Sequence, residues 1–221
     1  MARHRTHDLD RLMDAAERIA AESGSDAVTV RALSQATSVS NGAIYHAFGS
    51  RAGMMNQVWL RAARRFLELQ RDAVDNALAA SPAPQNAIEA VVAAADAPAE
   101  YLIRHPISGR FLLTVNRAEI LDRGEIPVEV AIQSDALDKA LTTLFIRLSR
   151  SVWNRADHES VAVIRDCVVE LPTALLLRGR RAPEPAVRER LAAAVRAVLF
   201  LTPPAFPRST STSRSRPGWP R

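Results

Sequence analysis

The chain has 221 residues, of which 48% are hydrophobic, 24% charged and 5% aromatic. This length suits one or two compact domains, and the abundance of alanine, leucine and valine favours helices over sheets. The single cysteine, Cys167, excludes a disulfide framework and a cysteine-rich metal site, and no apolar run reaches the roughly 18 residues of a membrane span. We therefore expect a cytoplasmic, all-α protein with no metal, no cofactor and no membrane partner.

The net charge of +5 is concentrated at the C-terminus. Residues 202–221 contain four arginines and no acidic residue, so the preceding chain carries only +1. This stretch is rich in proline, serine and threonine, which predicts a disordered basic tail. Such a tail would attract phosphates weakly and without sequence preference, so charge alone does not indicate a nucleic-acid-binding protein.

An amphipathic pattern predicts a first helix over residues 8–22, with Asp8 as its cap and Gly24 at its end. Two short helices follow, over 29–36 and 41–47, joined by a turn at 37–40. A longer helix is predicted over 51–78.

Five further helices are predicted over 86–104, 106–120, 127–153, 157–178 and 185–201. Pro98 could interrupt the first of them, and Pro172 should kink the fourth. The last helix carries apolar residues at alternating steps of four and three, a narrow seam typical of helix-on-helix packing. The seam could pack between two subunits or inside one.

The stretch SVSNGAIYHAFGSR, residues 38–51, combines few apolar residues with many polar ones. Leu33, Val39, Ile44 and Phe48 would anchor the two short helices on the first helix. Two short helices around a tight turn, supported by a preceding helix, form a helix-turn-helix. The polar side chains of the second short helix would then face outward together.

Several outward groups suit the backbone of a DNA duplex. With Ser40 as cap, the free N–H groups at the helix start can receive a phosphate oxygen. Tyr45 offers a hydroxyl, His46 a ring nitrogen and Arg51 a charge. Singly, Tyr45 is more often a packing residue and His46 a surface residue; their joint placement in a helix-turn-helix favours DNA contact.

The start of the same helix suits the bases. Asn41, Gly42 and Ala43 are slim enough to let the helix enter a groove. Asparagine can pair with adenine edges, and an alanine methyl can touch a thymine methyl.

The segment TVRALSQATSVSNGAIYHAFGSRAGMM, residues 29–55, resembles the DNA-binding signature of the tetracycline-repressor (TetR) family. The resemblance covers residues 8–60 in detail and the remainder only as an all-helical layout. It implies a DNA-binding domain over 1–50, a helical ligand-binding and dimerisation domain over 51–201, and the tail over 202–221.

The resemblance also implies which residues meet DNA. Four positions depart from the family pattern, namely Ser34, Ser38, Ala47 and Arg51, where the family prefers alanine, glycine, histidine and lysine. A non-glycine residue in a left-handed turn at position 38 would cost about 1 kcal/mol. The implied DNA-facing set is Thr29, Arg31, Ser40, Asn41, Gly42, Ala43, Tyr45, His46 and Arg51.

The family further implies an effector pocket among the middle helices and a dimer bundle on the last two. Candidate pocket residues are Trp59, Phe66, Tyr101, Arg104, Phe111, Leu112, Val115, Asn116, Arg117 and Trp153. Each aromatic could equally be a core residue, and the low charge of these helices suits an apolar ligand or an ordinary core. Candidate dimer residues are Ile164, Val168, Leu171, Leu175, Val187, Leu191, Ala194 and Val198.

We predict a homodimeric DNA-binding regulator, a ligand-responsive repressor with a near-palindromic operator and a small-molecule effector. An activator or a ligand-independent regulator of the same fold is the alternative. The sequence contains no glycine-rich phosphate loop, zinc-spaced ligand set or nucleophile elbow. These absences disfavour an enzyme on a helical scaffold, and the outward polar set disfavours a protein-interaction module.

Overall fold

The computed structural model describes residues 2–80, 85–115, 128–178 and 182–203. Within these ranges the fold is all-α, with nine α-helices and no strand, as predicted. The predictions made for Asn116, Arg117 and most of the basic tail lie outside the described residues.

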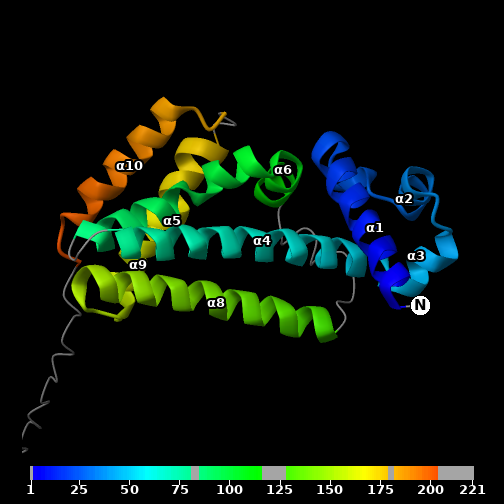
Figure 1. The fold of residues 1–221 in the computed structure, drawn as a ribbon, viewed down its shortest axis with the longest axis horizontal. Helices are drawn as coiled ribbons and strands as arrows, with labels where there is room; N and C mark the ends of the chain where they lie inside the picture. The colour runs from blue at the N-terminus through cyan, green and yellow to red at the C-terminus, as the bar shows by residue number, and fades with distance from the viewer. Residues whose placement is uncertain (1, 81–84, 116–127, 179–181, 204–221) are drawn as a thin grey trace, which may run out of the picture.

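The first four elements form one end of the molecule (Figure 1). They are α1 (Ala2–Ser23), a single 3₁₀ turn (Ser25–Ala27), α2 (Val30–Thr37) and α3 (Asn41–Phe48). Helix α1 ends at Gly24, whose φ of 86° lies in the left-handed region that glycine tolerates. The expected N-cap at Asp8 is wrong, because the helix already begins at Ala2.

Helix α4 (Arg51–Ala80) runs from this end to the opposite one (Figure 1). Helix α8 (Val128–Trp153) lies along one side of it, and α5 (Gln85–Arg104) packs against it. Pro98 does not interrupt α5, which continues for 20 residues with this proline buried inside it. The short helix α6 (Pro106–Thr114) turns back and packs on α1.

The C-terminal part consists of α9 (His158–Arg165) and α10 (Pro185–Leu199). Between them the chain continues in two π-helical turns, Asp166–Glu170 and Thr173–Leu177, on either side of Pro172. The distortion predicted at Pro172 therefore takes this form, since proline supplies no N–H and neighbouring turns must adjust.

The buried side chains form two cores. The N-terminal core joins α1–α3 to the first turns of α4 and also includes Phe111 of α6, which is fully buried. It therefore extends across the predicted boundary at residue 50. The C-terminal core is built from α4, α5, α8, α9 and α10.

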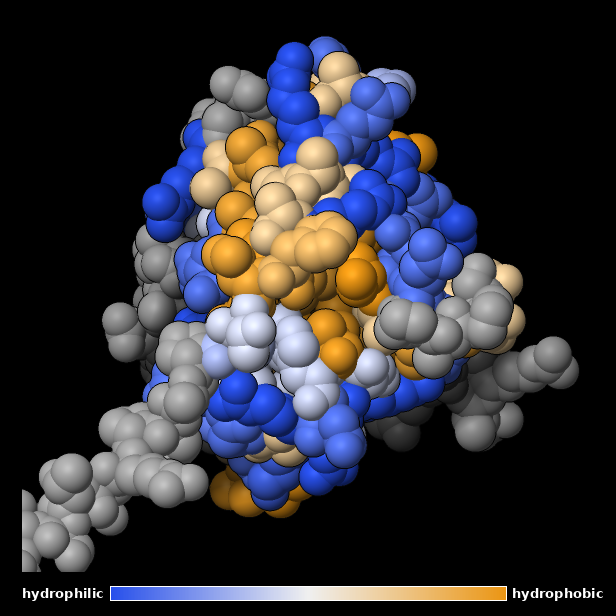
Figure 2. Space-filling model, turned by 90° about the vertical axis from the view of Figure 1, so that its left-hand side faces the viewer, coloured by the Kyte–Doolittle hydropathy of each residue, from blue (hydrophilic) through white to orange (hydrophobic). Residues whose placement is uncertain are grey.

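The end of the molecule opposite α1–α3 shows apolar side chains gathered between hydrophilic flanks (Figure 2). At the end of α10, Phe200 and Leu201 are 81% and 70% exposed. Large exposed apolar groups of this kind mark surfaces suited to contact with another molecule.

Candidate nucleic-acid interface

Helices α2 and α3 are each begun by a hydroxyl cap. The Thr29 Oγ1 accepts from the backbone N–H of Ala32 at 3.1 Å, and the Ser40 Oγ accepts from that of Ala43 at 3.2 Å. A hydroxyl that accepts in this way still has its own proton to donate. Both caps can therefore hold the helix start and still donate to a phosphate.

The turn between the two helices requires a left-handed residue. Ser38 occupies that position with φ of 62° and donates its N–H to the carbonyl of Ser34 at 2.9 Å. The left-handed conformation expected for this non-glycine residue is present. The hydroxyl of Thr37 supports the turn by donating to the Leu33 carbonyl at 2.7 Å.

Three apolar side chains hold the helix-turn-helix on its support. Leu33, Ile44 and Phe48 are all nearly fully buried in the N-terminal core, whereas Val39 is half-buried against it. Complete burial of such a side chain contributes roughly 1.5–3 kcal/mol. These few contacts fix α3 by one face, as predicted, and leave its other face to solvent.

That outer face is polar and slim. Tyr45 is 55% exposed, which is unusual for an aromatic residue of a core-anchored helix. A Cβ atom added at Gly42 would meet nothing within 4 Å, so no packing inside the chain requires glycine there. The exposed members of the predicted set are Thr29, Arg31, Ser40, Asn41, Gly42, Ala43, Tyr45 and His46.

Arg51 differs from the other members of the predicted set, because its guanidinium is already engaged. It is half-buried at the start of α4 and donates to the carbonyl of Val28 at 2.7 Å and to that of Ser25. Its Nη2 also lies 3.6 Å from the Asp26 carboxylate. The sequence prediction of a phosphate contact did not include these partners, which are more than 20 residues away along the chain.

Gly53 is a structural residue that the sequence prediction missed. A Cβ atom added there would lie 2.5 Å from the carbonyl oxygen of Phe48, too close for any side chain. The Gly53 N–H is bonded to the Ser50 hydroxyl at 2.9 Å. The first turn of α4 can therefore pass directly beside the end of α3.

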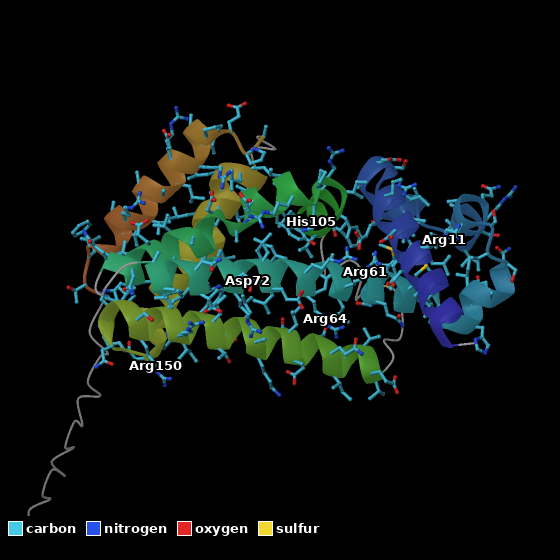
Figure 3. The ribbon with its side chains drawn as sticks, viewed as in Figure 1. Arg11, Arg61, Arg64, Asp72, His105 and Arg150 are labelled. Carbon is cyan, nitrogen blue, oxygen red and sulfur yellow. The ribbon has the colours of Figure 1, made fainter. Side chains whose placement is uncertain are left out.

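A cluster of ion pairs joins α1 to α4. Arg61, which Figure 3 shows between the two helices, lies 2.7 Å from Asp14 and 2.8 Å from Glu17. Glu17 is 3% exposed, so its carboxylate depends on Arg61 and on Arg65 at 3.7 Å. Burial acts to lower the pKa of Arg61, but the hydrogen bond and charge of Glu17, with Asp14, raise it overall.

Tyr101 is buried at the centre of an aromatic group that α4, α5 and the residue before α6 contribute. Its hydroxyl donates to the Ala62 carbonyl at 3.0 Å and shares a hydrogen bond with Ser108 at 3.1 Å. Phe66 meets its ring edge-on at 5.6 Å between centroids, and the His105 ring lies 5.1 Å away. Burial raises the pKa of Tyr101 above its ordinary value.

The candidate pocket residues that the structure describes lie in three different surroundings. Phe66 and Tyr101 are in contact, but Arg104 is exposed and paired with Glu100. Trp153 packs against the C-terminal core. The remaining described candidates belong to the N-terminal core or pack against it, namely Trp59, Phe111, Leu112 and Val115.

The candidate dimer residues are largely used within the chain. The seam of α10 packs toward α5, where Arg196 pairs with Glu89 at 2.7 Å and Arg188 holds Asp96. Ala194 alone is half-exposed and outside the core, while Leu171, Leu175 and Val198 are partly buried against it. The fully buried members are Ile164, Val168, Val187 and Leu191.

Comparisons with known proteins agree with this geometry. Residues 12–58, from α1 into α4, match the family model described as bacterial regulatory proteins, tetR family. No curated protein matches the chain.

Solved structures share the whole fold. A tetR-family regulatory protein from Rhodococcus RHA1 is 19% identical, with 90% of this chain and 98% of that chain covered and a TM-score of 0.61. A TetR-family transcriptional regulator from Streptomyces coelicolor is 23% identical, with 87% and 98% covered and a TM-score of 0.58. A protein assigned as a transcriptional regulator from Pseudomonas aeruginosa PAO1 is 17% identical, with 87% and 88% covered and a TM-score of 0.65.

The fold and the helix-turn-helix thus support a DNA-binding transcriptional regulator, and the family and the structural neighbours are regulators and not enzymes. Residues 12–58 carry a DNA-binding domain of the tetR type, which confirms the resemblance found in the sequence for this part of the chain. No helix in the described ranges is long and apolar enough to cross a membrane.

Proposed function

We propose that the protein is a homodimeric repressor that binds a near-palindromic operator and releases it when a small molecule binds the C-terminal helices. The observation that carries the DNA-binding part is the outer face of α3, fixed by Ile44 and Phe48 and otherwise exposed. In this proposal Asn41, Gly42 and Ala43 meet base edges, while Ser40, Tyr45 and His46 hold phosphates.

A homodimer is proposed because one α3 helix can contact only a short stretch of DNA. A single short helix covers only a half-site, so two copies about 34–36 Å apart would enter successive major grooves of a near-palindrome. The surface we propose for pairing lies on α8 and α9. A groove of about 490 Å³ between α8, α9 and the π-helical turn after α9 has a mixed lining, whose apolar part includes Leu141, Phe145, Val161 and Val169.

Release by an effector requires a connection from the C-terminal helices to α3. Helix α4 provides one, because it belongs to both cores and its Arg61 holds the acidic side chains of α1. A ligand that binds between the middle helices would shift α4 only as far as its affinity differs between two arrangements. A spacing of the two α3 helices that no longer fits the operator would then be favoured.

Selection of bound duplexes from a random pool, followed by mobility-shift titration, tests the DNA-binding part. Tyr45→Ala should weaken binding to the selected duplex roughly tenfold, because it removes a hydrogen-bonding phosphate contact. The melting temperature should hardly change, since this side chain is exposed. Lys139→Ala, which removes an exposed cation on α8, is the matched control and should bind normally. Equal binding by the Tyr45→Ala protein would refute the assignment of this face.

A further inference from the structure

The guanidinium of Arg51 connects the first residue of α4 to the link between α1 and α2. Its Nε donates to the Val28 carbonyl at 2.7 Å, and its Nη2 donates to the Ser25 carbonyl. Two nitrogens of one planar group thus hold two carbonyls three residues apart. An arginine is suited to this geometry because its donors form a rigid fork, which a lysine ammonium does not provide.

The two carbonyls belong to the segment that places α2. Ser25 begins the 3₁₀ turn that follows α1, and Val28, which is fully buried, ends it. The next residue, Thr29, is the cap of α2. Any shift of Val28 would therefore move the start of α2, and α3 with it, relative to α4.

The charge of Arg51 is also partly compensated. Asp26 lies 3.6 Å from Nη2, and both carbonyl dipoles point at the same group. Arg31, the second residue of α2, has an exposed side chain instead. A phosphate near α2 would therefore meet a stronger uncompensated field from Arg31 than from Arg51.

We propose that Arg51 is a positioning residue for operator recognition: it sets where α2 and α3 stand on α4 and is not itself a phosphate contact. This inference rests on the DNA-binding function proposed above. The family resemblance implied a phosphate contact at position 51, and this inference replaces that role. It also means that arginine at position 51 is not equivalent to the lysine that the family prefers there.

The test uses the full chain and the selected operator, with an unrelated duplex of equal length for comparison. Affinities are measured at several salt concentrations for Arg51→Lys, Arg51→Gln, Arg31→Gln and Asp26→Asn. All titrations are made well below the melting temperature of each variant, so that only folded protein is compared.

If Arg51 positions α2, then Arg51→Gln should weaken operator binding roughly tenfold through lost charge-assisted hydrogen bonds. Binding to the unrelated duplex should change much less, and the slope of log affinity against log salt should stay as in the wild type. Arg51→Lys, although it keeps the charge, should also lose several-fold because an ammonium cannot span both carbonyls. Asp26→Asn leaves the fork in place and should bind almost normally.

Arg31→Gln gives the opposite signature and serves as the control for a phosphate contact. It should weaken both duplexes alike and reduce the salt slope by about 0.9, the value expected for one released counterion. The same signature from Arg51→Gln would overturn the proposal. So would wild-type binding by Arg51→Lys, or lower melting temperatures of the Arg51 variants with unchanged affinities.

Hydrogen exchange separates this inference from the proposed function. In the free proteins, the amides of residues 28–33 should exchange faster in Arg51→Lys and Arg51→Gln than in Asp26→Asn. Unchanged exchange would overturn the positioning role even if no variant binds DNA. A wild-type protein that binds no duplex, but shows faster exchange in the Arg51 variants, would refute only the proposed function.

Discussion

Helices α3 and α10 lie at opposite ends of the molecule and use their side chains in opposite ways (Figure 1). Helix α3 buries Ile44 and Phe48 and leaves five of its eight residues exposed, all of them polar or small except Tyr45, whose hydroxyl is its polar group. Helix α10 buries Val187, Leu191, Val195 and Leu199 in the core of its own chain. Its cations Arg188 and Arg196 are paired with carboxylates of α5.

The difference shows that an exposed polar face is better evidence for a binding partner outside the chain than an apolar seam is. A seam of leucine and valine can be satisfied by any helix, including one of the same chain. Exposed polar groups on a helix such as α3 do not help to hold the helix on the core. Their arrangement is therefore better evidence for a molecule outside the chain than an apolar seam is.

Leu191→Ala would test the internal role of α10 and has the largest expected effect. Leu191 is 1% exposed, so the truncation should lower the free energy of unfolding by about 3 kcal/mol through lost burial and a cavity. Urea unfolding measures the change. Because the contact lies inside one chain, the loss should not depend on protein concentration.

Val198→Ala is the matched control on the same helix, since this side chain is only partly buried. Its loss should be clearly smaller. If the effect of Leu191→Ala instead disappears as the protein concentration rises, then the seam stabilises an interface between subunits. The contrast between α3 and α10 would then be lost.

Gly53→Ala tests the support of α3 with an effect of intermediate size. The added methyl carbon would lie 2.5 Å from the Phe48 carbonyl oxygen, so the start of α4 and the end of α3 must separate. Strain of this kind costs typically 1–3 kcal/mol, and we expect about 2. Operator affinity should fall together with the melting temperature, both measured on the same preparation. Unaltered stability would show that the two helices separate without cost.

The sequence predicted the helix-turn-helix well because its signals are local. Caps, turn and anchors lie within about 20 residues of one another, so Thr29, Ser40 and Phe48 could be assigned from spacing, and the family resemblance implied the left-handed turn at Ser38. The left-handed conformation of Ser38 and the burial of Phe48 are as expected. The roles of Arg51 and Gly53 could not be predicted in this way, because they depend on how α4 passes the other helices.

The C-terminal helices illustrate the opposite case. Most of their bounds were predicted closely, since proline and polar turns separate them, but their partners were not. The bound predicted near residue 120 is wrong, because α6 ends at Thr114 and Val115 is already extended. Phe111 was expected among effector-binding residues, yet α6 places it in the N-terminal core. An apolar residue at helical spacing is compatible with a pocket, a core or an interface, and only the packing of distant elements decides among them.

Gly42→Ala has the smallest expected effect on stability and gives the sharpest test of the α3 face. Because nothing in the chain lies within 4 Å of the added carbon, alanine should stabilise the helix by about 0.5–1 kcal/mol. If glycine instead serves close approach to base edges, the same substitution should weaken operator binding several-fold. The melting temperature, measured by thermal unfolding, would then rise while the operator affinity, measured by mobility-shift titration, would fall.

Gln35→Ala, at an exposed position of α2 outside the predicted contact set, controls for helix propensity and should leave affinity unchanged. A Gly42→Ala protein that is more stable and binds the operator with unchanged affinity would show that the small side chains of α3 have no part in recognition. The exposed polar side chains around it would then be the whole basis for assigning this face to DNA.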